Sequence, residues 1–231
     1  MMKSLPGCAL FASMMLAGAT ATDPLQELLS RFDEAAASFH AMTAGVQYVT
    51  HTAVIDDNTE ESGTLLMRKV KNTEAQGRIE FTAPDKKTVT FEKSKAQVYL
   101  PKAKTLQIYD LGKHGEDLDR FLMMGFGSSG TELARDYYMR VMGSETVRGQ
   151  KTTKLEMVPK NEEMRKTVSK VELWIPERPS APYPVQEKIY QSGPGDYRLV
   201  SYSNLKINPA ITADALKLKV PAGVKTEYPQ K

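Results

Sequence analysis

The sequence predicts an α+β fold: a large, strongly bent antiparallel sheet (an incomplete β-barrel of about eleven strands) closed by helices on its concave face. Three observations predict it: helical spacing of apolar residues near the front, two-residue spacing over most of the rest, and few helical segments between the strands. The last observation excludes a parallel βαβ architecture. With 231 residues, 41% of them apolar, we expect one domain over residues 22–231.

An amphipathic helix of about four turns is expected at the front of this domain. Asp23 can cap its first turn, and Pro24 suits the first helical position. Apolar residues then recur at helical spacing, at Leu25, Leu28, Leu29, Phe32, Ala36 and Phe39. Such a helix needs an apolar surface to lie on.

From Gly45 onward apolar and polar residues alternate, which is typical of antiparallel strands with one buried and one solvated face. Turn signals such as Gly193–Asp196 separate the runs. The apolar members of the runs are Ile79, Phe81, Val89, Phe91, Val98, Leu100, Leu106, Ile108, Leu155, Met157, Val171, Leu173, Ile175, Leu199, Leu205 and Ile207.

Two further helical segments interrupt the strands, at Glu116–Met124 and Thr131–Arg135. The residues between them, Gly125–Gly130, match G-x-G-x-x-G, but the strand before and the long helix after that a dinucleotide site needs are missing. We therefore interpret Gly125, Gly127 and Gly130 as parts of a mobile hinge or lid. The proline-rich stretch Pro176–Pro184 is expected to be an irregular connection.

The first twenty-one residues have the features of a signal peptide. A positive start, Met1–Lys3, precedes the apolar Leu5–Ala19, which is too short for a good membrane span. Ala19–Ala21 has the small-x-small form of a cleavage site, so we expect cleavage after Ala21 and a periplasmic protein. The single cysteine, Cys8, leaves with this segment, so the mature chain has no disulfide or thiolate metal site.

The remaining residues offer little chemistry. The net charge is only +3 and the cations are scattered, which argues against a nucleic-acid partner. His40, His51 and His114 lack the spacing of a metal motif, and no G-x-S-x-G elbow is present. We expect no catalytic site, metal or cofactor, which leaves a binding or carrier function.

Apolar stripes from the sheet and the helices must meet on one side, where they form either a filled core or a hollow cavity. Periodicity does not distinguish the two, although Met123, Met124 and Met157 are side chains that adapt to pliant pockets. The candidates for lining such a cavity are Leu29, Phe32, Ile79, Phe81, Val89, Phe91, Val98, Leu100, Leu106, Ile108, Phe121, Leu122, Phe126, Leu155, Met157 and Leu173.

Four segments resemble the LolA/LolB family of periplasmic lipoprotein carriers. They are the block Leu65–Lys69 with Gly77–Phe81 and Pro84, the pair Val98–Pro101 and Leu106–Asp110, the strand Asn204–Asn208, and the tail Leu216–Val224. The likeness is loose but spans most of the mature chain. It is therefore compatible with a divergent member of the family that carries another lipid.

The resemblance implies an incomplete barrel closed by helices around a cavity for acyl chains, with an acylated lipoprotein or other lipid as cargo. It also implies an inner-membrane transporter and an outer-membrane acceptor as partners, transient membrane contact and a monomer. The arginine that latches the lid in the family falls near Arg68 or Lys69. The alternatives are a periplasmic sensor or protein-interaction module on the same fold and, third, an enzyme.

Overall fold

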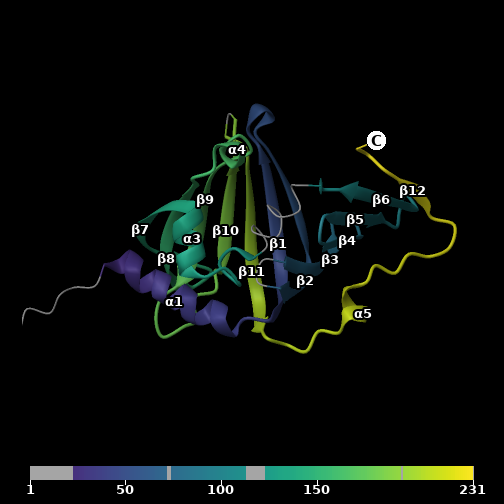
Figure 1. Cartoon of the computed structure of the whole chain (residues 1–231). Coiled ribbons are helices and arrows are strands. Elements are labelled where there is room, and N and C mark those ends of the chain that lie inside the picture. The colour runs from purple at the N-terminus through teal and green to yellow at the C-terminus, as the bar shows by residue number, and fades with distance from the viewer. Residues whose placement is uncertain (1–22, 72–73, 113–122, 194, 231) are drawn as a thin grey trace, which may run out of the picture.

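The computed structural model describes residues 23–71, 74–112, 123–193 and 195–230 (Figure 1). Its helices are α1 (Pro24–Ser38), α3 (Gly130–Asp136), α4 (Glu162–Arg165) and α5 (Ala213–Leu216). Its strands are β1 (Ala41–Thr52), β2 (Asp57–Lys71), β3 (Glu74–Ala83), β4 (Lys87–Glu92), β5 (Lys95–Leu100), β6 (Thr105–Asp110), β7 (Tyr137–Val147), β8 (Gln150–Pro159), β9 (Val168–Pro176), β10 (Gln186–Gln191), β11 (Tyr197–Ile207) and β12 (Lys225–Glu227).

The strands form one open sheet in the order β12-β6-β5-β4-β3-β2-β1-β11-β10-β9-β8-β7. The sheet bends strongly: in Figure 1 the central strands run up the view, whereas β4–β6 run across it. The α+β class and the open, bent sheet are confirmed. The sheet has twelve strands, and the short β12 runs parallel to β6, so the sheet is mixed.

Helix α1 begins as expected. The Asp23 side chain accepts a hydrogen bond from the Leu25 backbone N–H at 3.0 Å, and Pro24 occupies the first turn. Its apolar face, with Leu28 and Phe32, is buried against the sheet. On the same helix the Arg31 guanidinium donates to the carbonyl oxygens of Pro176 (2.7 Å) and Ser180 (3.0 Å), so α1 also holds the connection between β9 and β10.

The core lies on the helix-covered face of the sheet and consists of two clusters. The β8–β9 cluster comprises Leu28, Phe32, Met124, Leu133, Tyr137, Leu155, Met157, Val168, Val171, Leu173 and Ile175. The β1–β3 cluster comprises Phe39, Met42, Ala44, Val46, Leu65, Met67, Ala75, Ile79, Phe81, Phe91, Met123, Phe126, Tyr183 and Val200. Both clusters are packed, because their members retain less than a tenth of their exposed surface.

The pairing register of the strands puts two groups of residues on other faces of the sheet than the alternation in the sequence predicts. Directly paired residues share a face, and Val98 pairs with Gln107, so Leu106 and Ile108 lie on the opposite face from Val98. In β11 the register shifts at Asn204, whose φ is 49°. This bulge puts Leu205 on the helix-covered face, while Leu199 lies on the other.

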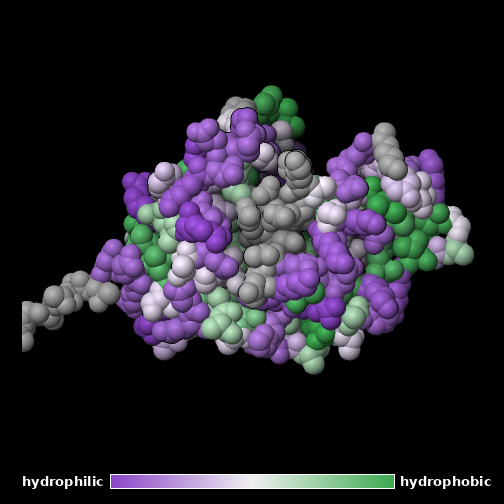
Figure 2. Space-filling model, viewed as in Figure 1, coloured by the Kyte–Doolittle hydropathy of each residue, from purple (hydrophilic) through white to green (hydrophobic). Residues whose placement is uncertain are grey.

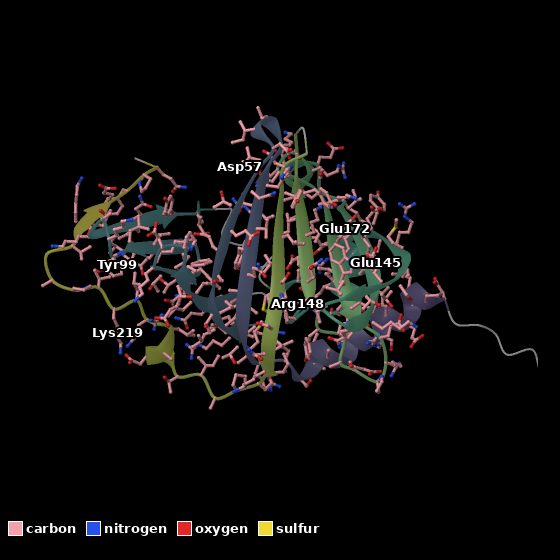
Figure 3. The ribbon with its side chains drawn as sticks, turned by 180° about the vertical axis from the view of Figure 1, so that it is seen from behind. Asp57, Tyr99, Glu145, Arg148, Glu172 and Lys219 are labelled. Atoms are coloured by element: carbon pink, nitrogen blue, oxygen red, sulfur yellow. The ribbon has the colours of Figure 1, made fainter. Side chains whose placement is uncertain are left out.

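The face of the sheet opposite α1 and α3 carries a buried carboxylate, Glu172 of β9, which is 4% exposed (Figure 3). It accepts hydrogen bonds from Lys170 Nζ (2.8 Å) and Tyr190 Oη (3.1 Å), and Lys154 Nζ lies 3.3 Å away. Burial alone raises the pKa of Glu172, but the hydrogen bonds from Lys170 and Lys154 outweigh it, so the pKa lies below its usual value.

We expect Glu172→Gln to lower the free energy of unfolding at pH 7 by about 1–3 kcal/mol, because two lysines lose a charged partner. Because the pKa of Glu172 is lower in the folded state than the value of 4.5 in the unfolded chain, its ionised form stabilises the fold above pH 4.5. The difference in unfolding free energy between wild type and Glu172→Gln should therefore shrink as pH falls below 4.5. Urea unfolding from pH 3 to pH 7 measures both effects.

The matched control is Glu163→Gln in α4, whose side chain is 79% exposed. It should change stability by less than about 0.5 kcal/mol. Equal unfolding free energies for Glu172→Gln and wild type at pH 7 would contradict the stabilising role of this network.

Candidate functional site

The glycine-rich segment forms a tight, buried turn that leads into α3. The Met123 carbonyl oxygen accepts the backbone N–H groups of Phe126 (3.0 Å), Gly127 (2.8 Å) and Ser128 (3.0 Å). Ser129 then caps α3 in a capping box with Glu132, so the predicted short helix is confirmed.

The three glycines of this turn allow close packing. A Cβ at Gly130 would lie 2.2 Å from the Leu29 carbonyl oxygen, and one at Gly127 would lie 2.1 Å from Met123 Cε. Gly125 has a φ of 74°, in the left-handed region that favours glycine. These contacts explain why glycine stands there, and the hinge role of the three residues stays a prediction.

Four aromatic rings meet beneath this turn and the end of α1. Phe126 stacks on Tyr183 with ring centroids 6.1 Å apart, and it meets Tyr202 edge-on at 5.0 Å. Phe39, just after α1, lies 6.2 Å from Tyr183. The cluster therefore fixes Tyr183, in the β9–β10 connection, against the helix-covered face of β11.

A pocket of about 550 Å³ lies where the sheet is incomplete, and we call it the seam pocket. Strand β10 pairs with β11 only up to Ser201, so the later residues of β11 face the β9–β10 connection instead of a strand. The pocket is lined by Val147, Arg148, Gln150, Pro176, Ser180, Ala181, Tyr183, Pro184, Val185, Tyr202, Ser203, Asn204, Leu205 and Ile207.

The seam pocket draws its lining from both faces of the sheet. Tyr202 packs against Phe126 on the helix-covered face, so the next residue, Ser203, points to the opposite face. Arg148, in the exposed β7–β8 turn, lies near the lower part of β11 (Figure 3). The pocket therefore runs from an exposed cation at its rim to the aromatic cluster beside the core.

A second carboxyl group is buried next to this pocket, on Glu187 of β10, which is 4% exposed. The Tyr202 hydroxyl donates to its Oε2 at 3.2 Å, whereas its Oε1 has no hydrogen-bond partner. Burial raises the pKa of Glu187 to about 8, and the Tyr202 hydrogen bond opposes this only in part. The carboxyl is therefore mostly neutral at pH 7. Burial also raises the pKa of Tyr202 well above its usual value.

Most of the predicted cavity-lining residues that the structure describes come together on the helix-covered face. Phe32, Leu155, Met157 and Leu173 belong to the β8–β9 cluster, and Ile79, Phe81, Phe91 and Phe126 belong to the β1–β3 cluster, with Val89 packed against it. Leu29 is buried, and Val98 and Leu100 are partly buried. Leu106 and Ile108 lie on the other face, and Phe121 and Leu122 lie outside the described residues.

The latch candidates on β2 point in opposite directions. Met67 is in the core, so Arg68 lies on the face opposite α1 and α3, where its Nε donates to Gln76 Oε1 at 2.9 Å. Lys69 shares the face of Met67, at the end of β2. The signal peptide, its cleavage site after Ala21 and His114 lie outside the described residues.

The seam pocket and Glu187 were not found from the sequence, although one signal was present. Val185 and Ile189 are apolar and lie two residues before and two residues after Glu187. Alternation therefore places Glu187 on the same side of the strand as these two apolar residues. In the ranges that the structure describes, no three His, Cys, Asp or Glu residues could hold a metal ion. None of the described helices is long and apolar enough to cross a membrane.

The raised pKa of Glu187 predicts a pH-dependent stability. The folded state holds the carboxyl proton more tightly than the unfolded chain, whose value is near 4.5, so this contribution is full below 4.5 and is lost as pH rises through 8. Over this pH interval we expect the free energy of unfolding of wild type to fall relative to that of Glu187→Gln by on the order of a few kcal/mol, since one pKa unit corresponds to about 1.4 kcal/mol.

Urea unfolding of both proteins between pH 5 and pH 9 checks this expectation. Glu163→Gln, at an exposed position, should keep the wild-type pH profile. Parallel profiles for wild type and Glu187→Gln would show that Glu187 titrates alike in the folded and unfolded states.

Comparison with known proteins gives structural matches alone. No family model matches the chain, and no curated protein sequence matches it. Among solved structures, MucB matches with a TM-score of 0.51 and 14% identity, over 84% of this chain and 62% of MucB. An uncharacterized conserved protein from Thermus thermophilus matches with a TM-score of 0.51 and 15% identity, over 88% of this chain and 98% of that protein.

A LolA superfamily protein from Nitrosomonas europaea is also among the matches. It has a TM-score of 0.41 and 12% identity, and the match covers 84% of this chain and 97% of that protein. At such identities the two matches with the higher TM-score establish a shared fold. The chain therefore has the fold of MucB and of the Thermus thermophilus protein, which here is an open, bent sheet with α1 and α3 on its core face.

Proposed function

We propose that the protein is a periplasmic carrier that shelters the acyl chain of a lipid or an acylated lipoprotein and moves it towards the outer membrane. The observation that carries this proposal is the seam pocket, which joins an exposed cation to an aromatic cluster beside the core. The resemblance to LolA/LolB carriers and the features of a signal peptide in residues 1–21 support the periplasmic setting.

The size and lining of the seam pocket suit one end of an amphiphile. Its volume of about 550 Å³ falls within the range of small-molecule sites, roughly 300–1,000 Å³. Val185, Leu205 and Ile207 offer an apolar wall, and Tyr183 and Tyr202 offer polar tips. Arg148 is exposed at the rim and has no ion-pair partner among the described residues, so it can meet an anionic headgroup.

A carrier of this kind needs only moderate affinity. Moving an acyl chain out of water gains about 0.8 kcal/mol per methylene, and a bilayer offers the same gain. A pocket that matches the bilayer can therefore both load and release its cargo.

An exposed apolar tip favours transient membrane contact. The face in Figure 2 is mostly hydrophilic, with an apolar group at the upper tip of the β1–β2 hairpin. Val54 and Ile55, in the turn between these strands, are 79% and 69% exposed. Such a tip can insert shallowly among lipid headgroups and bring the carrier to its donor or acceptor.

The second candidate is a protein-interaction module, and the packing of the core favours it. Leu155, Met157, Leu173 and Ile175 are fully buried, so the described part of the β8–β9 cluster holds side chains where a hollow carrier would hold lipid. MucB, one of the structural matches, is known in complex with MucA. A module of this class would purify with a protein partner and without lipid.

Filling the seam pocket tests the carrier proposal. We expect Ala181→Trp to weaken binding of a fluorescent fatty-acid analogue about tenfold or more, which corresponds to about 1.4 kcal/mol, because the indole takes up pocket volume. Ala103→Trp, in the exposed turn between β5 and β6, is the matched control and should bind as wild type does.

Mass spectrometry of an organic extract of the freshly purified protein provides the independent readout. Wild type and Ala103→Trp should yield copurifying lipid, and Ala181→Trp should yield less. Absence of both lipid and probe binding in wild type would refute the carrier function and leave the interaction module.

Arg148 predicts a preference for anionic amphiphiles. Arg148→Gln should weaken binding of a fatty acid by about three- to fivefold, because an exposed ion pair is worth up to about 1 kcal/mol, and should leave a neutral ester unaffected. Lys86→Gln, in the exposed turn before β4, removes the same charge elsewhere and should change neither. An equal loss for both ligands would assign Arg148 a role in pocket shape instead of charge.

A further inference from the structure

Glu187 is a buried acid that nothing in the fold explains. Its Oε2 accepts the Tyr202 hydroxyl, but its Oε1 is fully buried and has no hydrogen-bond partner. No cation lowers the pKa of Glu187: burial raises this pKa, and the hydrogen bond from Tyr202 opposes the rise in part. Leaving a buried polar group without a partner is unfavourable, and most buried polar groups in proteins have one.

Glu187 is not part of the lining of the seam pocket but contacts one lining residue, Tyr202. Val185 and Tyr202 both line the pocket, and the Tyr202 backbone N–H donates to the Val185 carbonyl oxygen at 2.9 Å. Glu187 is two residues after Val185, so it shares that face of the sheet, and it pairs with Val200 of the β1–β3 cluster. Tyr202 thus belongs both to the pocket wall and to the hydrogen bond with Glu187.

We propose that Glu187 and Tyr202 form an internal polar site that binds the ester or amide carbonyl of an acyl chain held in the seam pocket. This inference rests on the carrier function proposed above and adds the group of the cargo that is recognised inside the protein.

The protonation of Glu187 selects the chemistry of its ligand. The raised pKa makes the acid neutral at pH 7, so one oxygen carries a hydrogen. With the Tyr202 hydroxyl donating to Oε2, we place the hydrogen on Oε1, which then is a donor without an acceptor. A carbonyl oxygen is a neutral acceptor and satisfies this donor without bringing a charge into the core.

The site also needs side chains that can yield to a ligand. Phe126 covers Tyr202 from the turn, and the neighbouring Met123 and Met124 are flexible, unbranched side chains of the core clusters. When an acyl chain displaces these side chains, one apolar contact replaces another. The new hydrogen bond therefore determines the difference in affinity between ligands of equal length.

The test compares two ligands that differ only in the ester group. Methyl hexadecanoate and octadecane have chains of the same length, and each competes with a fluorescent fatty-acid analogue for the full-length mature protein. We expect the preference of wild type for the ester to fall about fivefold in Glu187→Leu, the loss of one neutral hydrogen bond. Glu187→Gln, whose amide N–H still donates, should keep most of the preference.

Infrared spectroscopy of a carbonyl-labelled ester gives a readout that a purely structural role would not move. The carbonyl band of the ester bound to wild type should lie at a lower frequency than that of the same ester in hexane, and the band of the ester bound to Glu187→Leu should not. Equal preference in wild type and Glu187→Leu, or an unshifted band in wild type, overturns the carbonyl site. If Glu187→Leu does not fold, the wild-type band decides. Failure of both ligands to displace the probe from wild type instead refutes the carrier function itself.

Discussion

The structure depends on covering one apolar face of a bent sheet with helices α1 and α3 and a buried turn. Helix α1 packs Leu28 and Phe32 onto β8 and β9, while Arg31 holds the carbonyl groups of Pro176 and Ser180. This contact keeps the β9–β10 connection under the helix and lets Tyr183 stack on Phe126. Because the connection lies there as an irregular segment, the end of β11 has no strand on its β10 side, and the seam pocket follows from this.

Local patterns predicted the elements better than they predicted their faces. The Asp23–Pro24 start and the helical spacing identified α1, and α3 was also expected. Alternation divides a strand into two faces without saying which faces of neighbouring strands coincide. The β5–β6 register therefore separated Leu106 from Val98, and one extra residue at Asn204 moved Leu205 to the face opposite Leu199.

The candidate site was harder to predict because it is built from an irregular connection and a strand end. Tyr183 and Ala181 lie in a segment without periodicity, and Arg148 is brought near β11 only by the fold. Whether an apolar face is filled or hollow depends on side-chain packing in three dimensions, which no spacing in the sequence encodes. The packed clusters and the separate pocket at the seam show that this chain combines both arrangements.

The two buried carboxyl groups of this sheet make the strongest case that Glu187 serves a ligand. Glu172 and Glu187 are equally buried, and they lie on neighbouring strands. On the face opposite α1 and α3, Lys170, Lys154 and Tyr190 surround Glu172, so the acid stays ionised and has partners. On the helix-covered face, Glu187 has the Tyr202 hydroxyl alone. The same chain thus surrounds a buried acid with partners where its role is structural, and the partner that Glu187 lacks is one that cargo can bring.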